Sequence, residues 1–123
     1  GQYGGNDPND SSGILRYVRV EYAGIEFSPD NELNGIAFQG VGRGTVVDHI
    51  QVSFNKDDGI EMFGGSTDLK HIVLSSIGDD SLDWTFGWNG RVQYAIVQHL
   101  ELAKRVVGGG FHNVIEHNFK SST

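Results

Sequence analysis

Two pairs of adjacent aspartates are the residues of this sequence best suited to chemistry. The pairs begin 22 residues apart, and each is followed three residues later by a further acidic side chain. Carboxylates brought together can bind Ca²⁺, which takes oxygen ligands, or can divide acid and base roles in glycoside hydrolysis. The candidate metal ligands are Asp57, Asp58, Asp79 and Asp80, and the candidate catalytic residues are Asp58, Glu61, Asp80 and Asp83.

The same aspartates also suit tight turns, because their side chains hydrogen-bond nearby backbone amides and tolerate unusual φ angles. Polysaccharide lyase chemistry would in addition need a base, and Arg91 or Lys56 is available. No motif assigns these roles. The sequence therefore favours a non-catalytic module that binds a polysaccharide, a small molecule or a cation, and leaves a glycoside hydrolase or polysaccharide lyase as the alternative.

Two short apolar segments alternate along the chain and predict the elements that position the aspartates. One segment begins at Ile36, Ile60, Leu82 and, more loosely, Ile115. The other begins at Leu15, Val47, Leu69 and Val92. In the middle of the chain, successive members of each series lie 22–24 residues apart. Two interleaved series with one period indicate a repeating strand–turn–strand unit.

Such a unit buries its apolar side only by stacking on copies of itself. We therefore predict an all-β fold, a right-handed parallel β-helix of three to four coils forming one domain over residues 1–123. Residues 1–12 would be a turn-rich segment, 13–99 the regular coils, and 100–123 an insertion or cap plus a partial coil. An antiparallel sandwich is the alternative, but it gives no reason for side chains to match at this period.

The period is interrupted at two places, which locate the predicted site. Insertions at 23–33 and 100–112 lengthen the first and last of the corners that lead from the second segment to the first. Because equivalent corners lie on one edge of the stack, the insertions should flank the two aspartate corners as walls. Coils stack about 4.8 Å apart, so like charges would lie over one another and favour a bound cation such as Ca²⁺.

The aromatic and histidine side chains predict further stacking. Strict strand alternation places His49 and His71 inside the coil, as a ladder with Tyr17 and Tyr94 in the flanking coils. A metal site would need a third ligand beside the two histidines. Trp84 and Phe86 are expected in the core, whereas Trp88 suits either the core or a sugar-binding surface. Trp84, Phe86 and Trp88 occupy every second position of one run, so strand alternation places them on one face.

Composition excludes several classes of function. The 123-residue chain carries a net charge of −7 without a basic cluster, so nucleic acid is not an expected partner. It has no cysteine for disulfides or thiolate chemistry. No apolar run reaches the roughly 18–20 residues of a membrane span, so membrane insertion is not expected. No signal peptide is recognisable in the sequence.

The phrases Leu15-Arg16-Tyr17-Val18, Gly40-Val41-Gly42-Arg43-Gly44-Thr45 and Asp57-Asp58-Gly59-Ile60-Glu61 resemble coils of secreted bacterial β-helix proteins of the pectin-lyase-like type. The resemblance covers about the first three quarters of the chain. It implies the β-helix fold and an extracellular or cell-surface location in a bacterium. It does not imply one activity, because a fold of this kind hosts lyases, hydrolases and binding proteins.

The ends of a short coil stack expose unpaired strand edges, which invite pairing unless they are covered. Residues 100–110 could form a short helix that caps one end. Residues 1–12 are polar and rich in turns, and look too weak to cap the other. The sequence therefore predicts a homo-oligomer formed end to end or along a face.

Overall fold

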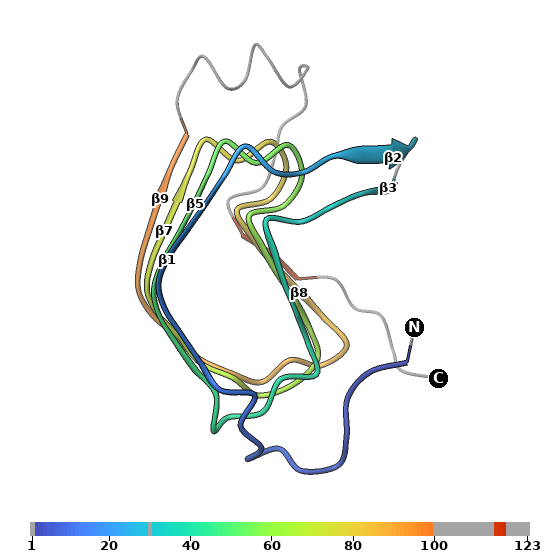
Figure 1. The fold of residues 1–123 in the computed structure, drawn as a ribbon, viewed down its shortest axis with the longest axis vertical. Coiled ribbons are helices and arrows are strands. Elements are labelled where there is room, and N and C mark those ends of the chain that lie inside the picture. Colours follow the sequence, from blue (N-terminus) through green and yellow to red (C-terminus); the bar gives the residue numbers. More distant parts are fainter. Residues whose placement is uncertain (1, 30, 100–114, 118–123) are drawn as a thin grey trace.

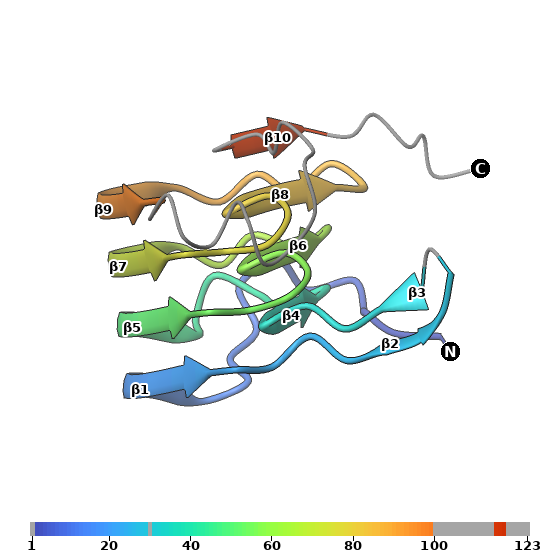
Figure 2. The same cartoon turned by 90° about the horizontal axis from the view of Figure 1, so that it is seen from above.

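A computed structural model describes residues 2–29, 31–99 and 115–117 and shows a parallel β-helix (Figures 1 and 2). One four-stranded sheet has the order β1-β5-β7-β9, and a second has the order β10-β8-β6-β4. The first sheet contains β1 (Ile14–Glu21), β5 (Val46–Ser53), β7 (Leu69–Ser75) and β9 (Val92–Gln98). The second contains β4 (Ile36–Gln39), β6 (Ile60–Phe63), β8 (Leu82–Thr85) and β10 (Ile115–His117). The predicted fold class is confirmed.

Every neighbouring pair in the two sheets is parallel, and the register follows the repeat seen in the sequence. Ile36 pairs with Ile60, Ile60 with Leu82, and Leu82 with Ile115. In the other sheet Leu15 pairs with Val47, and Leu69 with Val92. Equivalent side chains of successive coils therefore lie over one another, as Figure 2 shows for the strands.

The hydrophobic core is concentrated in the middle coils, which described residues cover from both sides. It consists of Phe38, Val47, Ile50, Val52, Ile60, Met62, Leu69, Ile72, Leu74, Ile77 and Leu82. Leu15, Val18 and Val20 of β1 are only partly buried. Val92 and Ile115, which the sequence pattern places inward, are exposed in the last coil.

The histidines do not point inward, which corrects the expected interior ladder. Tyr17, His49, His71 and Tyr94 each have a left-handed backbone conformation, with φ between 55° and 61°. This conformation inserts an extra residue into the strand alternation, so that Asp48 and His49 both lie outside while Val47 and Ile50 face the core. The rings do stack as expected, but on the outer surface.

The insertion at 23–33 forms the antiparallel hairpin of β2 (Glu26–Ser28) and β3 (Asn31–Glu32). Figure 1 shows this hairpin projecting from the edge of the coil where the chain leaves β1. The second predicted wall, at 100–112, and the predicted capping helix at 100–110 lie outside the described residues. Within the described ranges, no helix is long and apolar enough to cross a membrane.

Truncation of a core side chain should test the packing. Ile60 is completely buried in β6, so Ile60→Ala should lower the free energy of unfolding by about 2–5 kcal/mol through lost burial and a residual cavity. Ile96, which is 63% exposed, provides the matched control, and Ile96→Ala should change that free energy by no more than about 0.5 kcal/mol. Urea unfolding measures both, and equal losses would contradict the assigned core.

Candidate functional site

The acidic corner, residues 55–61 together with 77–83, begins with a turn that Asn55 holds in place. The side chain of Asn55 is buried, and its Nδ2 donates to the carbonyl oxygens of Asp57 at 3.0 Å and Asp58 at 2.8 Å. Gly59 then passes close to the next coil, where a Cβ would lie 2.6 Å from the carbonyl oxygen of Ser81. Any larger residue would push the two coils apart at the point where the aspartates are presented.

The corners of successive coils are joined by backbone and side-chain hydrogen bonds. The amide of Asp80 donates to Asp58 Oδ1 at 3.0 Å, and the amide of Gly59 donates to the carbonyl oxygen of Asp80 at 2.9 Å. The amide of Gly78 donates to the carbonyl oxygen of Asn55 at 2.8 Å. These bonds fix the first aspartate pair directly over the second.

The structure brings most of the predicted acidic residues together around Asp58. Oxygen atoms of Asp57, Asp58 and Asp79 lie within 4.8 Å of one another. Oxygen atoms of Asp58, Glu61 and Asp83 form a second set within the same distance. Both sets combine carboxyl groups from two adjacent coils, and Asp58 belongs to both.

Asp80 and Asp83 are less accessible than the sequence pattern indicates. Asp80 is buried, belongs to neither of these sets, and is tied to Asp58 through its backbone amide. Asp83 pairs in register with Glu61, on the outward side of β8, yet it too is buried. The accessible carboxyl groups of the corner are therefore those of Asp57, Asp79 and Glu61.

Burial and mutual repulsion change the acidity of the corner. Burial, followed by the charge of Asp57, raises the pKa of Asp58 to about 8. Burial, with a further contribution from the charge of Asp79, also raises the pKa of Asp57. At neutral pH Asp58 is therefore largely protonated while it holds the amide of Asp80. A divalent cation at this place would favour the ionised forms.

The hairpin insertion packs directly against the acidic corner. Gly24, at φ 90°, lies so close that a Cβ would be 2.6 Å from the amide nitrogen of Lys56. Lys56 Nζ lies 2.8 Å from Glu26 Oε2, and this hydrogen bond raises the pKa of Lys56. Beyond the hairpin, Asn34 Nδ2 donates to Glu61 Oε2. The predicted first wall therefore contacts the turn of the acidic corner, and Asn34, which follows it, contacts the strand that carries Glu61.

The two bases considered for lyase chemistry are in different places. Lys56 belongs to the acidic corner, but its ammonium group is engaged with Glu26. Arg91 forms an ion pair with Asp68 at 2.6 Å, just before β7 and β9 begin. That position is at the opposite end of the strands from the acidic corner, so Arg91 is not brought to the acidic residues.

An exposed aromatic pair lies at the ends of β1 and β5, and its second member, Phe54, directly precedes the acidic corner in the chain. Tyr22 and Phe54 follow β1 and β5, and their rings stack with centroids 5.1 Å apart and planes 5° apart. Both have φ near 55°, which turns the rings outward at the ends of the strands. Sequence reasoning missed this pair, although its 32-residue separation equals that of the paired residues Leu15 and Val47.

The tryptophans differ in part from their prediction. Trp84 packs against the core, as expected. Trp88 also packs there, and its Nε1 donates to the carbonyl oxygen of Thr67 at 3.0 Å. Phe86, which is expected in the core, is exposed: its φ of 52° breaks the alternation that would place it on the same side as Trp84.

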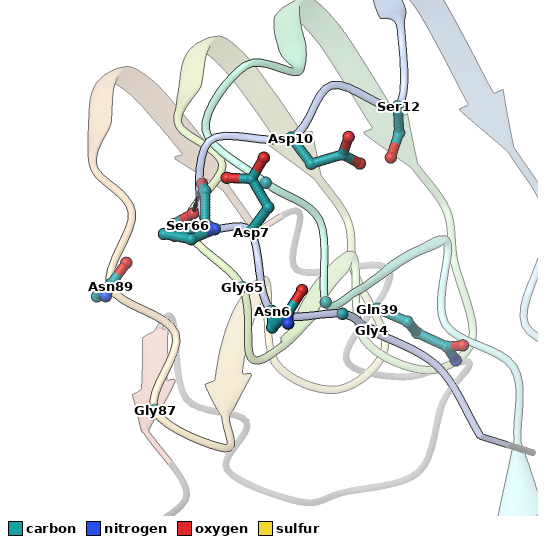
Figure 3. Close-up of a pocket in the computed structure, with 14 residues that line it drawn as sticks. Gly4, Asn6, Asp7, Asp10, Ser12, Gln39, Gly65, Ser66, Gly87 and Asn89 are labelled. Atoms are coloured by element: carbon teal, nitrogen blue, oxygen red, sulfur yellow. Dashed lines mark hydrogen bonds between the residues drawn. The ribbon is translucent and has the colours of Figure 1, made fainter.

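A hollow lies at the opposite corners of the coils, where the N-terminal segment crosses them (Figure 3). The segment is held by hydrogen bonds from the Arg43 amide and the Ser66 hydroxyl to the carbonyl oxygen of Pro8. The hollow has a volume of about 590 Å³, and its polar lining includes Asn6, Asp7, Asp10, Ser12, Gln39, Ser66 and Asn89. Sequence reasoning missed it because residues 1–12 lie outside the repeat and carry no motif.

The comparisons with known proteins agree with the architecture. The family model described as a pectate-lyase like beta helix domain matches residues 1–121. No curated protein and no solved structure matches the chain.

The raised pKa of Asp58 predicts how stability depends on pH without added cations. Between about pH 4, the ordinary carboxyl value, and pH 8, the folded state retains a proton that the unfolded state has lost. The free energy of unfolding should therefore fall as the pH rises through this interval. Asp58→Asn, which keeps an acceptor for the Asp80 amide, should flatten this dependence.

Melting temperatures measured by circular dichroism from pH 4.5 to 8, in the presence of a chelator, provide the check. Asp10→Asn is the matched control, because Asp10 is an exposed aspartate away from the acidic corner. It should leave the slope as it is in the unmodified protein. An unchanged slope in Asp58→Asn would show that this carboxyl does not titrate as its burial requires.

Proposed function

The chain belongs to the pectate-lyase-like β-helix domain family, and we propose that it is a non-catalytic module that binds a divalent cation and a carbohydrate at its acidic corner. Family membership relates the chain to a polysaccharide-related fold. The fold alone does not assign an activity. The function is therefore argued from the corner itself.

The observation that carries the cation proposal is the convergence of Asp57, Asp58 and Asp79 from two coils. Their oxygen atoms lie within 4.8 Å of one another, and burial and like charge raise the pKa of two of them. A cation converts this repulsion into attraction. Ca²⁺ fits best, because it accepts 6–8 oxygen ligands in flexible geometry and can complete its shell with water or sugar hydroxyls.

The surroundings of the corner support a carbohydrate as the second ligand. The stacked rings of Tyr22 and Phe54 present a flat apolar surface of the kind on which a sugar ring packs. The neighbouring hairpin exposes Ile25 and Phe27. Carboxyl and amide groups at Glu61 and Asn34 supply hydrogen-bonding partners on the other side. Apolar surface with a few polar groups is typical of ligand sites.

The proposal extends to the setting in which the module works. The net charge of −7 disfavours nucleic acid as a partner. A bacterial cell surface or the extracellular space, where polysaccharides and millimolar calcium occur, suits the proposed ligands. We also propose that the module assembles as a homo-oligomer through the unpaired edges of its coils.

A polysaccharide-active enzyme is the second candidate, and the protonated state of Asp58 is the observation that favours it. A carboxyl group with a pKa of about 8 can act as a general acid at neutral pH. Glu61 and Asp83 place oxygen atoms within 4.8 Å of those of Asp58, near the separation of about 5 Å of retaining glycosidases. The burial of Asp58 and Asp83 weighs against direct contact with a sugar.

Millimolar Ca²⁺ should raise the melting temperature, because a ligand that binds only the folded state stabilises it. The effect should be larger at pH 8 than at pH 5, where protons compete for the carboxyl oxygens. Asp57→Asn combined with Asp79→Asn should abolish the shift, whereas Asp10→Asn should preserve it. Absence of any calcium-dependent shift in the unmodified protein would overturn the cation proposal.

The choice between binding and catalysis can be made with a panel of acidic and neutral polysaccharides. We expect retention of the protein on one or more immobilised polysaccharides, without release of reducing ends or of unsaturated products. Turnover that Asp58→Asn or Asp80→Asn abolishes would instead establish the enzyme. Tyr22→Ala should weaken retention at least about tenfold if its ring packs on the sugar.

The assembly proposal predicts a species larger than a monomer by light scattering. Ile14 is an exposed residue of β1, the edge strand of the first sheet. One edge of β1 pairs with β5, and the other has no partner strand among the described residues. Ile14→Lys should shift the population toward monomer, because a lysine on an edge strand opposes edge pairing. A monomeric unmodified protein at high concentration would contradict the prediction.

A further inference from the structure

The outer face of the first sheet carries a row of stacked rings, one from each coil. The ring centroids of Tyr17 and His49 are 4.6 Å apart, those of His49 and His71 4.4 Å, and those of His71 and Tyr94 5.0 Å. The side chains of His49 and His71 are 42% and 38% exposed. The two imidazoles of the middle coils are therefore accessible from solvent and held by a tyrosine on either side.

Asp48 completes a set of three metal-ligating side chains. The left-handed conformation of His49 leaves Asp48 on the same outer face as its neighbour. Asp48 Oδ1 lies 2.8 Å from Nδ1 of His49 and 2.8 Å from Nδ1 of His71. The hydrogen bond from His71 is the main reason that the pKa of Asp48 is lowered, so the carboxylate is ionised at neutral pH.

We propose that Asp48, His49 and His71 form a binding site for a transition-metal dication of the Zn²⁺ type. Two imidazole nitrogens and one carboxylate oxygen are a ligand set that suits Zn²⁺, Ni²⁺ and Cu²⁺ and discriminates against Ca²⁺, which prefers oxygen alone. Three protein ligands leave a fourth position for water or an external ligand. This site is separate from the acidic corner in place and in chemistry.

The distances are close to those that a metal ion requires. Metal–ligand bonds of about 2.0–2.1 Å at tetrahedral angles place ligand atoms about 3.3 Å apart. The two observed nitrogen–oxygen distances are 2.8 Å, so a small rotation of the Asp48 carboxyl group would open enough room. Each imidazole would offer the lone pair of its Nδ1 atom to the ion and carry its proton on Nε2.

The charged neighbours set the strength of the site. Arg16 and Lys70 occupy the equivalent strand positions in the coils on either side of Asp48, and both oppose a bound cation. Lys70 Nζ lies 5.8 Å from the centroid of the Tyr94 ring, toward β9 and away from β5. The site is open to solvent at a hollow of about 300 Å³ lined in part by Tyr17, Arg19, His49 and His71. We therefore expect exchangeable binding at micromolar metal concentrations.

Titration calorimetry with Zn²⁺ alone tests the proposal on the unmodified chain. One equivalent should bind, and His49→Gln, His71→Gln and Asp48→Asn should each weaken binding more than tenfold, since even indirect partners of a metal contribute about 10–100-fold. His99→Gln is the matched histidine control, because His99 belongs to none of the three groups of potential metal ligands among the described residues. Because the three ligands lie at the surface, the variants should retain the circular dichroism spectrum of the parent.

Two further measurements distinguish this site from the acidic corner. The Asp57→Asn, Asp79→Asn double variant should lose calcium binding but retain the one equivalent of Zn²⁺. Co²⁺ should give visible absorption of a nitrogen- and oxygen-ligated, four- or five-coordinate ion, and this absorption should disappear in His71→Gln. Absence of Zn²⁺ binding, or binding that survives loss of both His49 and His71, would overturn the proposal.

Discussion

The in-register stacking of parallel coils is the constraint on which the rest of this structure depends. Each residue of a coil lies over its counterpart in the next, so the chain cannot choose the neighbour of one side chain independently of the repeat. In the interior this places Ile60 over Leu82 and completes a continuous apolar column. At the corners it requires glycine where backbones approach closely, as at Gly59.

The same constraint forces like charges together at the acidic corner. In most sheets opposite charges can be set across from one another, but here a repeated Asp-Asp turn stacks carboxyl on carboxyl. The molecule answers in part through hydrogen bonding, since the Asp80 amide donates to Asp58, and in part through protonation of Asp58. A bound cation would be a third way to reduce the repulsion between these carboxyl groups, and it is the basis of the proposed function.

The architecture could be predicted from the sequence because the spacing of the repeat indicates which residues of distant strands pair with one another. The register Ile36–Ile60–Leu82–Ile115 is predicted from it and is confirmed. An insertion at 23–33 is predicted as well, but not that it forms a hairpin. The prediction that the histidines point inward is wrong, because it rests on a strict two-residue alternation that the left-handed residue in each strand interrupts. The correct signal was available, since Val47, Ile50 and Val52 show a three-then-two spacing that Leu69, Ile72 and Leu74 repeat.

Other features of the sites could not be predicted from residue spacing. The convergence of Asp57, Asp58 and Asp79 follows from stacking, but the burial of Asp80 and Asp83 depends on how the corner closes over them. The hollow beneath residues 4–12 depends on where a non-repeating segment comes to rest. Residue spacing predicts the position of the repeated strands, but the position of a non-repeating segment depends on how it packs in three dimensions.

The left-handed residue in each strand of the first sheet also has a consequence for how such a surface can change. It presents one side chain per coil in a straight file with a pitch of about 4.8 Å, and the file is uncoupled from the core because Ile50 and Ile72 fill the interior beside it. The core therefore does not restrict which residue occupies each place, and the restriction comes from the stacking of each ring on its neighbours. The outer face of this sheet thus presents one side chain per coil at a regular spacing. The row Tyr17, His49, His71 and Tyr94 is one of many such rows that the same core could carry.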